Sequence, residues 1–318
     1  MQAYGVRGSF DPGRPLEYAP DVLRVATGIV NTYLVGEADR WVLVDTGIAG
    51  FGSLIRRAAE ARFGPGTRPA AIILTHGHFD HAGNADVLAT EWNAPVYAHP
   101  LELPYLNGQS DYPPPDPTVG GAMAFMSRAF PYSGRKLSNG VRPLDTRVPE
   151  LPDWQWLHTP GHTAGHISLF RDVDRLLLAG DALATMNVDS WLEQVCRTPE
   201  PCNPPAPLTT DWEAARRSVE QLARLEPQAI GAGHGLPLAG EGLPDMLSDF
   251  AATFTLPPQG RYVVAPAYAG PSGVEWIPPP VPDPFPRQAA GAALVAFGVW
   301  GLAAAARRGK GRPRGRRA

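Results

Sequence analysis

Residues 75–84 read THGHFDHAGN and directly follow the apolar run AAIIL at 70–74. Four of the six residues at 76–81 carry side chains that can bind metal ions, namely His76, His78, Asp80 and His81. In an extended backbone, side chains two residues apart point to the same side. The first two histidines can therefore contact one ion, while the turn directs the last two ligands to a second. Imidazole and carboxylate are groups that zinc prefers at catalytic sites.

Three further segments each place a potential ligand directly after an apolar strand. They are TPGHTAGH at 159–166 with His162 and His166, LLLAGDAL at 176–183 with Asp181, and AIGAGHG at 229–235 with His234. A carboxylate or imidazole beside glycines at a strand end is costly in an apolar core and suits the rim of a binding site. A histidine-rich loop without metal explains one such segment, but it does not explain four of them.

Apolar strands and amphipathic helices alternate around these segments, which indicates an α/β layered domain. We expect strands at 22–45 (two or three antiparallel strands), 70–75, 95–99, 154–158, 166–171, 175–180 and 229–233. We expect helices at 50–62, 84–92, 120–130, 211–225 and 243–254. Thr210 is the expected N-cap of the helix at 211–225, because Glu213 follows it at the spacing of a capping box.

The motifs THGHFDHAG, PGHTAGH, AGDAL and GAGHG, together with VDTG at 44–47, resemble those of the metallo-β-lactamase superfamily. The resemblance covers residues 20–250 and is closest to the glyoxalase II-like and lactonase-like branches. It implies a four-layer αββα sandwich with two metal ions at one edge of its sheets. The ligands it implies are His76, His78 and His162 for the first metal, Asp80, His81 and His234 for the second, and Asp181 between both.

The cofactor that this resemblance implies is a pair of zinc ions, and iron or manganese are alternatives. Two dications near each other lower the pKa of a bridging water, so that hydroxide is available to attack a polarised carbonyl. Asp80 is both a ligand and a candidate proton acceptor. Asp45 either accepts the N–H of a ligand imidazole or only ends a strand before a turn. His166 is a second candidate for a supporting role, and we expect it to pack or hydrogen-bond near the PGHT turn rather than to bind metal.

The leading functional hypothesis is a metal-dependent hydrolase of a small ester, lactone or thioester. One alternative is a mononuclear iron enzyme similar to persulfide dioxygenases. Another is a non-catalytic binding module tethered to a membrane. The expected partner is a small molecule. A nucleic-acid surface is not expected, because residues 1–306 carry 21 basic and 31 acidic side chains.

The 318 residues divide by composition into four parts. Residues 1–256 form the expected catalytic domain, and residues 257–288 form a Pro-rich linker or strap. Residues 289–306 are uncharged and predict an apolar C-terminal helix, which is just long enough to span a bilayer core. Residues 307–318 form a basic tail. No secretory signal is recognisable, so we expect a cytoplasmic body, with membrane association through 289–318 left open.

Overall fold

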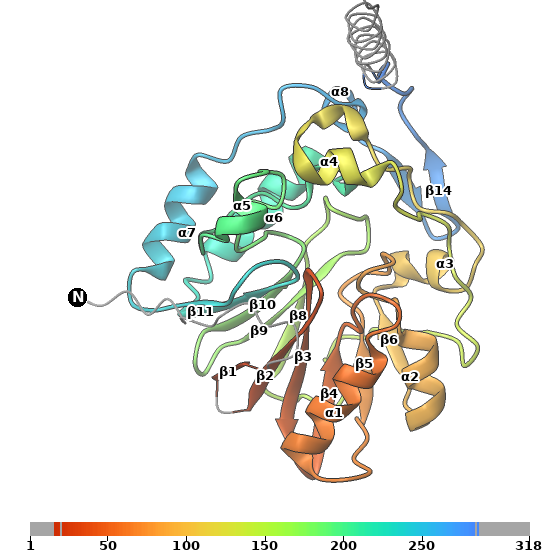
Figure 1. The fold of residues 1–318 in the computed structure, drawn as a ribbon, viewed down its shortest axis with the longest axis vertical. Coiled ribbons are helices and arrows are strands. Elements are labelled where there is room, and N and C mark those ends of the chain that lie inside the picture. Colours follow the sequence, from red (N-terminus) through yellow and green to blue (C-terminus); the bar gives the residue numbers. More distant parts are fainter. Residues whose placement is uncertain (1–15, 20, 284, 286–318) are drawn as a thin grey trace, which may run out of the picture. The chain divides into compact units, whose positions relative to one another are not determined.

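The computed structural model describes residues 16–19, 21–283 and 285 (Figure 1). The described residues up to Pro280 form one compact unit, which contains every element considered below. The apolar helix expected at 289–306 and the basic tail at 307–318 lie outside the described residues. Within the described part of the chain, no helix combines the length and apolar character that a membrane crossing requires.

Two sheets form the centre of the compact unit (Figure 1). The first contains, in spatial order, β1 (Leu16–Ala19), β2 (Val22–Thr27), β3 (Val30–Glu37), β4 (Arg40–Val44), β5 (Ala71–Ile73), β6 (Val96–Ala98) and β7 (Arg142–Pro143). The second contains β12 (Leu238–Ala239), β11 (Ala229–Ala232), β10 (Leu176–Gly180), β9 (Ile167–Arg171) and β8 (Trp154–His158). Strands β4 to β7 pair in parallel, as do β10 and β11, and the remaining pairs are antiparallel.

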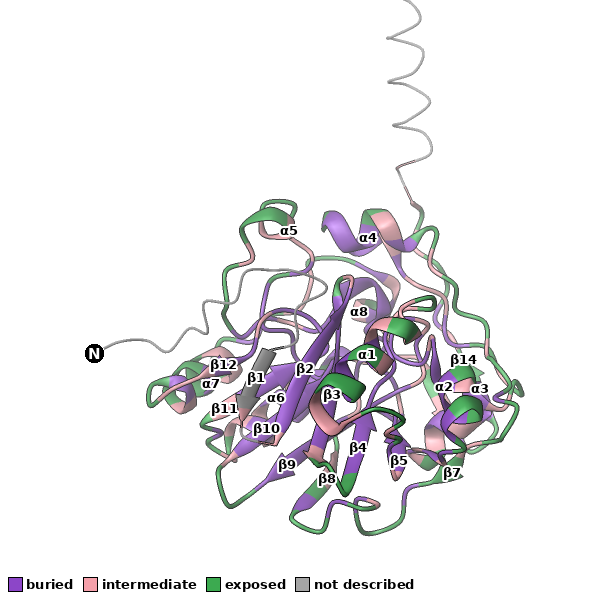
Figure 2. Cartoon of the chain, turned by 60° about the horizontal axis from the view of Figure 1, so that its bottom comes forward, coloured by how far each residue is buried: buried purple, intermediate pink, exposed green. Residues whose placement is uncertain are grey.

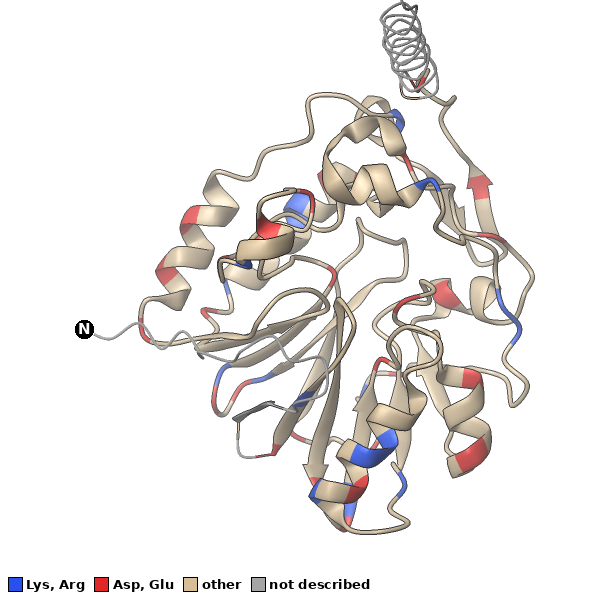
Figure 3. Ribbon diagram, viewed as in Figure 1, with Lys and Arg blue, Asp and Glu red and all other residues tan. Residues whose placement is uncertain are grey.

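Helices cover the outer faces of both sheets. The α-helices of the described residues are α1 (Gly52–Phe63), α2 (Ala85–Trp92), α3 (Leu103–Leu106), α4 (Gly121–Ser127), α5 (Glu193–Cys196), α6 (Trp212–Ala223), α7 (Leu243–Ala252) and α8 (Arg261–Val264). Three short 3₁₀ helices are η1 (Pro100–Glu102), η2 (Pro117–Val119) and η3 (Ala206–Leu208). Charged residues lie on the helices of the first sheet (Figure 3). Arg56 on α1 pairs with Glu91 on α2.

The period of two along each strand divides the core into three apolar layers. Strand β4 sends Trp41 and Leu43 towards α1 and α2, and Val42 and Val44 towards the other sheet. Side chains of β10 also alternate between two layers. Leu176 and Leu178 lie between the sheets, and Leu177 lies beneath α6 and α7. The layers are therefore helix, sheet, sheet and helix, and the central strands β2 to β5 and β9 to β11 are mainly buried (Figure 2). This arrangement confirms the α/β layered domain.

Residues 257–280, the larger part of the predicted Pro-rich strap, contain α8 and the hairpin of β13 (Tyr268–Gly270) and β14 (Gly273–Trp276). Tyr262 on α8 is buried in the cluster beneath α6 and α7, and its hydroxyl donates to the Pro114 carbonyl at 2.6 Å. The segment therefore packs on the preceding residues as part of the same unit.

The prediction that Thr210 caps α6 is wrong. Asp211 is the N-cap, and its carboxylate accepts a hydrogen bond from the Ala214 backbone N–H at 2.9 Å. Both residues favour the capping position, and the register of the first turn decides between them. Thr210 instead makes longer hydrogen bonds to the carbonyls of Gly161 and His162, so it joins the start of α6 to the loop after β8.

Replacing Asp211 by alanine is expected to lower the free energy of unfolding by about 1 kcal/mol, because one N–H at the start of α6 loses its acceptor. The Glu213→Ala variant is the control in the same helix, and it should change stability by less than about 0.5 kcal/mol. Urea unfolding of both variants is the measurement. Equal effects of the two substitutions would contradict the assignment of Asp211 as the cap.

Candidate metal centre

The predicted ligand residues lie at one end of the two sheets, each in a segment that follows a strand. His76, His78, Asp80 and His81 follow β5, and His162, Asp181 and His234 follow β8, β10 and β11. Parallel strands end at the same edge of a sheet, so β5 brings its loop beside the end of β4, and β10 does so beside β11. The two edges are joined where the Ile167 N–H donates to the Thr75 carbonyl at 3.0 Å. All seven side chains are buried.

The seven side chains form three overlapping groups, and within each group the ligand atoms lie within 4.8 Å of one another. The groups are His76–His78–His162, His76–His81–Asp181 and Asp80–His81–His234. In the first group, His78 Nδ1 lies 3.0 Å from His162 Nε2. The structure thus brings together residues that are up to 158 positions apart in the sequence, since His76 and His234 belong to one connected cluster.

Asp181 joins the groups from the second sheet. Its Oδ2 lies 3.2 Å from His234 Nε2 and 3.5 Å from His162 Nε2, while its Oδ1 lies 3.4 Å from His81 Nε2. Asp80 approaches the same region, with Oδ2 3.7 Å from His234 Nε2. The Asp181 carboxylate therefore stands between histidines of the first and the second predicted ligand set.

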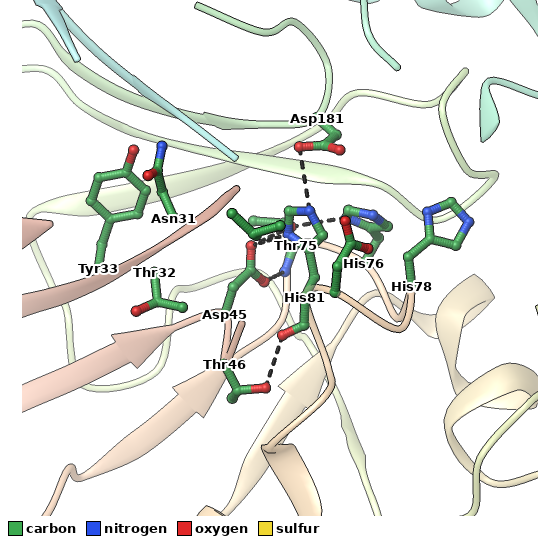
Figure 4. Close-up of polar contacts among 12 residues, drawn as sticks. Asn31, Thr32, Tyr33, Asp45, Thr46, Thr75, His76, His78, His81 and Asp181 are labelled. Carbon is green, nitrogen blue, oxygen red and sulfur yellow. Dashed lines mark hydrogen bonds and ion pairs between the residues drawn. The ribbon is translucent and has the colours of Figure 1, made fainter. Parts of the chain in front are cut away.

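Asp45, at the end of β4, holds the loop after β5 from behind. Its Oδ2 accepts hydrogen bonds from His81 Nδ1 and the Thr75 hydroxyl, both at 2.8 Å, and its Oδ1 accepts from the Thr75 N–H. Figure 4 shows Asp45 and Asp181 at opposite edges of the His81 ring. The Thr46 hydroxyl donates to the His81 carbonyl at 2.8 Å, so both the backbone and the ring of His81 are fixed.

In His76 and His234, as in His81, Nδ1 makes a hydrogen bond away from the cluster and Nε2 faces the cluster. Nδ1 of His76 lies 3.1 Å from the Thr75 hydroxyl, and Nδ1 of His234 lies 2.9 Å from the Ile29 carbonyl. Because the Thr75 hydroxyl donates to Asp45 and a carbonyl has no proton, each Nδ1 is the donor in these pairs. The lone pair of each Nε2 is then left facing the cluster, which is the arrangement that metal-binding histidines need.

His166 is oriented the other way. Its Nε2 accepts a hydrogen bond from the Asp181 backbone N–H at 2.8 Å, and its Nδ1 lies 2.9 Å from the Thr159 hydroxyl. Burial lowers the pKa of His166 to about 3, so the ring is neutral and keeps the acceptor that this geometry needs. The structure therefore places His166 behind Asp181, where it fixes the backbone of that residue.

Charge within the cluster is unevenly distributed. Burial lowers the pKa of His76, His78 and His162, which keeps these rings neutral. Burial also opposes the charged form of His81, but the Asp181 and Asp45 carboxylates outweigh it and raise its pKa well above the usual value. The carboxylates on the His81 side of the cluster therefore need a nearby positive charge.

Polar atoms without hydrogen-bond partners test whether a metal fits here. Among the described residues, His76 Nε2, His81 Nε2, Asp80 Oδ1 and Asp181 Oδ1 are buried and have no such partner. A buried polar atom left unpaired costs about 1–3 kcal/mol, so four in one cluster require an explanation. All four are lone-pair atoms of metal-ligand type. Divalent cations would contact these atoms and place positive charge beside the carboxylates, so the residues present fit a metal centre.

Comparison with known proteins agrees with this geometry. The family model described as the metallo-beta-lactamase superfamily matches residues 25–234. The chain belongs to this superfamily. A probable metallo-hydrolase of Bacillus subtilis, YflN, is 41% identical over 245 residues, which is 75% of this chain and 93% of that protein. As a member of the superfamily, the chain is a metal-dependent hydrolase.

Two further proteins are similar to this chain at lower identity. A hydroxyacylglutathione hydrolase of Alkalilimnicola ehrlichii is 32% identical over 118 residues, which is 37% of this chain and 34% of that protein. The crystal structure of a beta-lactamase domain protein from Burkholderia ambifaria superposes with a TM-score of 0.54 at 20% identity and covers 79% of each chain. At that identity the crystal structure is evidence for the fold alone.

Sequence reasoning missed the residues that hold the His234 loop. Asn31 on β3 donates to the carbonyls of Ala232 and Gly235 at 2.8 and 2.7 Å, and its backbone N–H donates to the Gly233 carbonyl. These partners are about 200 residues away along the chain, and an asparagine within a strand carries no local signal of such a contact. A side chain at Gly233 would collide with Asp181, so this glycine is required for the close approach.

Replacing Asn31 by alanine is expected to lower the free energy of unfolding of the metal-free protein by about 2–3 kcal/mol, since buried carbonyls lose their donors. The control is Asn203→Ala, because the Asn203 amide is exposed and donates one hydrogen bond, to the Thr255 carbonyl. Its effect should stay below about 1 kcal/mol. Urea unfolding in the presence of a chelator measures both, and similar values would contradict the role given to Asn31.

Proposed function

We propose that this metallohydrolase uses two divalent cations, with zinc as the first candidate, to hydrolyse a small ester, lactone or thioester. The observation that carries the proposal is the presence of two ligand sets, each with its own imidazoles, which share one carboxylate. A mononuclear centre would leave one of these sets, with its buried unpaired atoms, unexplained. The ligand types suit zinc, and iron and manganese bind the same groups.

The residues divide between two positions in this proposal. His76, His78 and His162 would hold the first cation, Asp80, His81 and His234 would hold the second, and Asp181 lies between the two sets. Such cations, when bound, would supply an acidified water molecule and polarisation of a carbonyl group.

The protein contributes fixed geometry and a proton acceptor. Asp45 and Thr75 keep His76 and His81 in the tautomer whose Nε2 faces the cluster, so no rearrangement is needed before reaction. Asp80 has one oxygen near His234, and its Oδ1 has no hydrogen-bond partner among the described residues. We assign Asp80 as the acceptor of the proton that the attacking water loses.

A small hollow beside His234, called the opening below, is lined mainly by apolar side chains. These are Ile29, Met123, Met186 and Val188, with Gln194 and Arg197 at its side. Ile29 lies between β2 and β3 and is 39% exposed, so a bound molecule can cover it. Burial of apolar surface favours binding, and the proposed substrate therefore carries an apolar group next to its scissile carbonyl.

The purified chain is expected to bind about two equivalents of zinc and to hydrolyse compounds in a panel of esters, thioesters and lactones. Asp181→Asn should lower turnover at least about 100-fold, because an NH₂ group, which cannot bind a metal ion, replaces one carboxylate oxygen. Asp172→Asn is the control, since Asp172 is exposed and pairs with Arg175. Metal analysis and initial rates are the measurements.

One iron per chain with oxygen uptake would contradict this proposal and favour the dioxygenase. Two bound metals without turnover of any compound would favour the binding module.

Replacing Ile29 by serine is expected to reduce kcat/KM about 5- to 10-fold for acyl groups of six or more carbons, and much less for acetyl compounds. The control is Val87→Ser, which changes an exposed valine on α2 that does not line the opening. Equal losses for short and long acyl groups in Ile29→Ser would show that the opening does not contact the substrate.

A further inference from the structure

A buried carboxylate outside both ligand sets joins two of the loops that carry them. Glu102 is the last residue of η1, directly before α3, and its side chain is fully buried. It lies between leucines in the segment PLELPYL, and nothing in that local pattern indicates a function. A buried carboxylate is costly unless hydrogen bonds compensate it, so its partners account for its presence.

Each oxygen of Glu102 accepts two hydrogen bonds. Oε1 accepts from the Thr163 hydroxyl at 2.7 Å and from the Gly165 N–H at 3.0 Å. Oε2 accepts from the Gly77 N–H at 2.9 Å and from the Tyr112 hydroxyl. One carboxylate therefore satisfies donors from three segments of the chain.

These donors flank the three histidines of the first ligand set. Gly77 lies between His76 and His78, and Thr163 directly follows His162. Glu102 therefore ties the loop after β5 to the loop after β8 at the points where each presents its ligands.

Both loops reach the carboxylate through glycines. A Cβ atom at Gly165 would lie 2.8 Å from the Glu102 side chain, and a Cβ atom at Gly77 would collide with Tyr112 and Leu106. Because glycine has no Cβ atom, the backbone of each loop can approach Glu102 closely at Gly77 and Gly165.

Tyr112 connects the same carboxylate to a ligand ring. Its ring centroid lies 4.6 Å from that of His78, and its hydroxyl donates to Glu102. Tyr112 is buried, so its ring limits the positions open to His78 on that side.

The second ligand set is held by other groups. His81 is fixed by Asp45 and Thr46, and His234 by the Ile29 carbonyl. None of these hydrogen bonds, within the described residues, includes Glu102. Asp45 supports both sets, through Thr75 to His76 and directly to His81, whereas the hydrogen bonds of Glu102 reach only residues adjacent to the first set.

We propose that Glu102 is a positioning residue for the first cation, and that it sets the affinity of the His76–His78–His162 set without affecting the Asp80–His81–His234 set. This inference rests on the proposed dinuclear centre. Supporting groups of this kind typically change metal affinity by about 10- to 100-fold when they are removed.

Glu102→Gln tests the proposal because it keeps the shape and changes the acceptors. Each Glu102 oxygen accepts a backbone N–H, and a glutamine has one oxygen for these two donors. The amide NH₂ must face one of them, so one loop moves away. Thr163→Val and Tyr112→Phe each remove one donor and leave the carboxylate in place, and Glu91→Gln, an exposed carboxylate on α2, is the control.

The measurement is zinc titration of metal-free protein against a chromophoric chelator. Glu102→Gln is tested in two backgrounds. His234→Ala removes a ligand of the second set and leaves the first set complete, whereas His78→Ala removes a ligand of the first set and leaves the second set complete. In the first background the substitution should weaken zinc binding about 10- to 100-fold. In the second it should change the affinity by less than about 3-fold, because that set has its own supports. A general loosening of the fold would weaken both equally.

Equal losses in both backgrounds, or no loss in either, would overturn the role of Glu102 while leaving the proposed function intact. A wild-type chain that binds no zinc would instead contradict the proposed function itself. If Glu102→Gln does not fold, Thr163→Val decides, since it should weaken the first set by a smaller factor and leave the second unchanged. Absence of that selectivity in Thr163→Val would overturn the proposal.

Discussion

The buried carboxylate of Asp181 is the constraint on which the candidate centre depends. It stands within 3.5 Å of imidazole nitrogens from three segments, and water is excluded around it. A charge in such a place is stable only when opposite charge or donors compensate it. The fold meets this condition by ending β10 opposite the loop after β5, so that histidines from both sheets face one carboxylate. A cation at the same place would serve all of these groups at once.

Hydrogen bonds from buried side chains hold the ligand loops in place in the folded protein. Each ligand loop has its own anchor: Asp45 for the loop after β5, His166 for the backbone of Asp181, and Asn31 for the His234 loop. Glu102 links two loops that the sheets alone do not connect. Because these anchors are buried and fully hydrogen-bonded, the ligand atoms are placed before any metal or substrate arrives. Preorganisation of this kind is what allows a metal centre to act without a reorganisation cost.

Membership of the metallo-beta-lactamase superfamily and the local chemistry point in the same direction. The superfamily accounts for the hydrolase class, while the surroundings of the centre bear on the substrate. The opening beside His234 is apolar on most sides, whereas the cluster within is polar and charged. The substrate class that we propose, with an apolar group attached to a reactive carbonyl, was inferred from these two regions. The division between a fixed polar centre and an apolar opening is a common property of enzyme sites.

The sequence by itself determined most of the longer strands, most of the helices and the identity of the ligand-type residues, but it did not indicate short strands such as β7, β12 and the β13–β14 hairpin. Period-two alternation is local, so residues such as Trp41 and Val42 reveal their opposite faces without tertiary information. The choice of Asp211 over Thr210 as a cap depended on the register of the first turn, and the roles of Asn31 and Glu102 depended on partners far away in the chain. Only the tertiary structure decided these, because hydrogen bonds between distant segments leave no periodic pattern in the sequence. The packing of two sheets, which no single segment encodes, determines which donors meet a buried carboxylate.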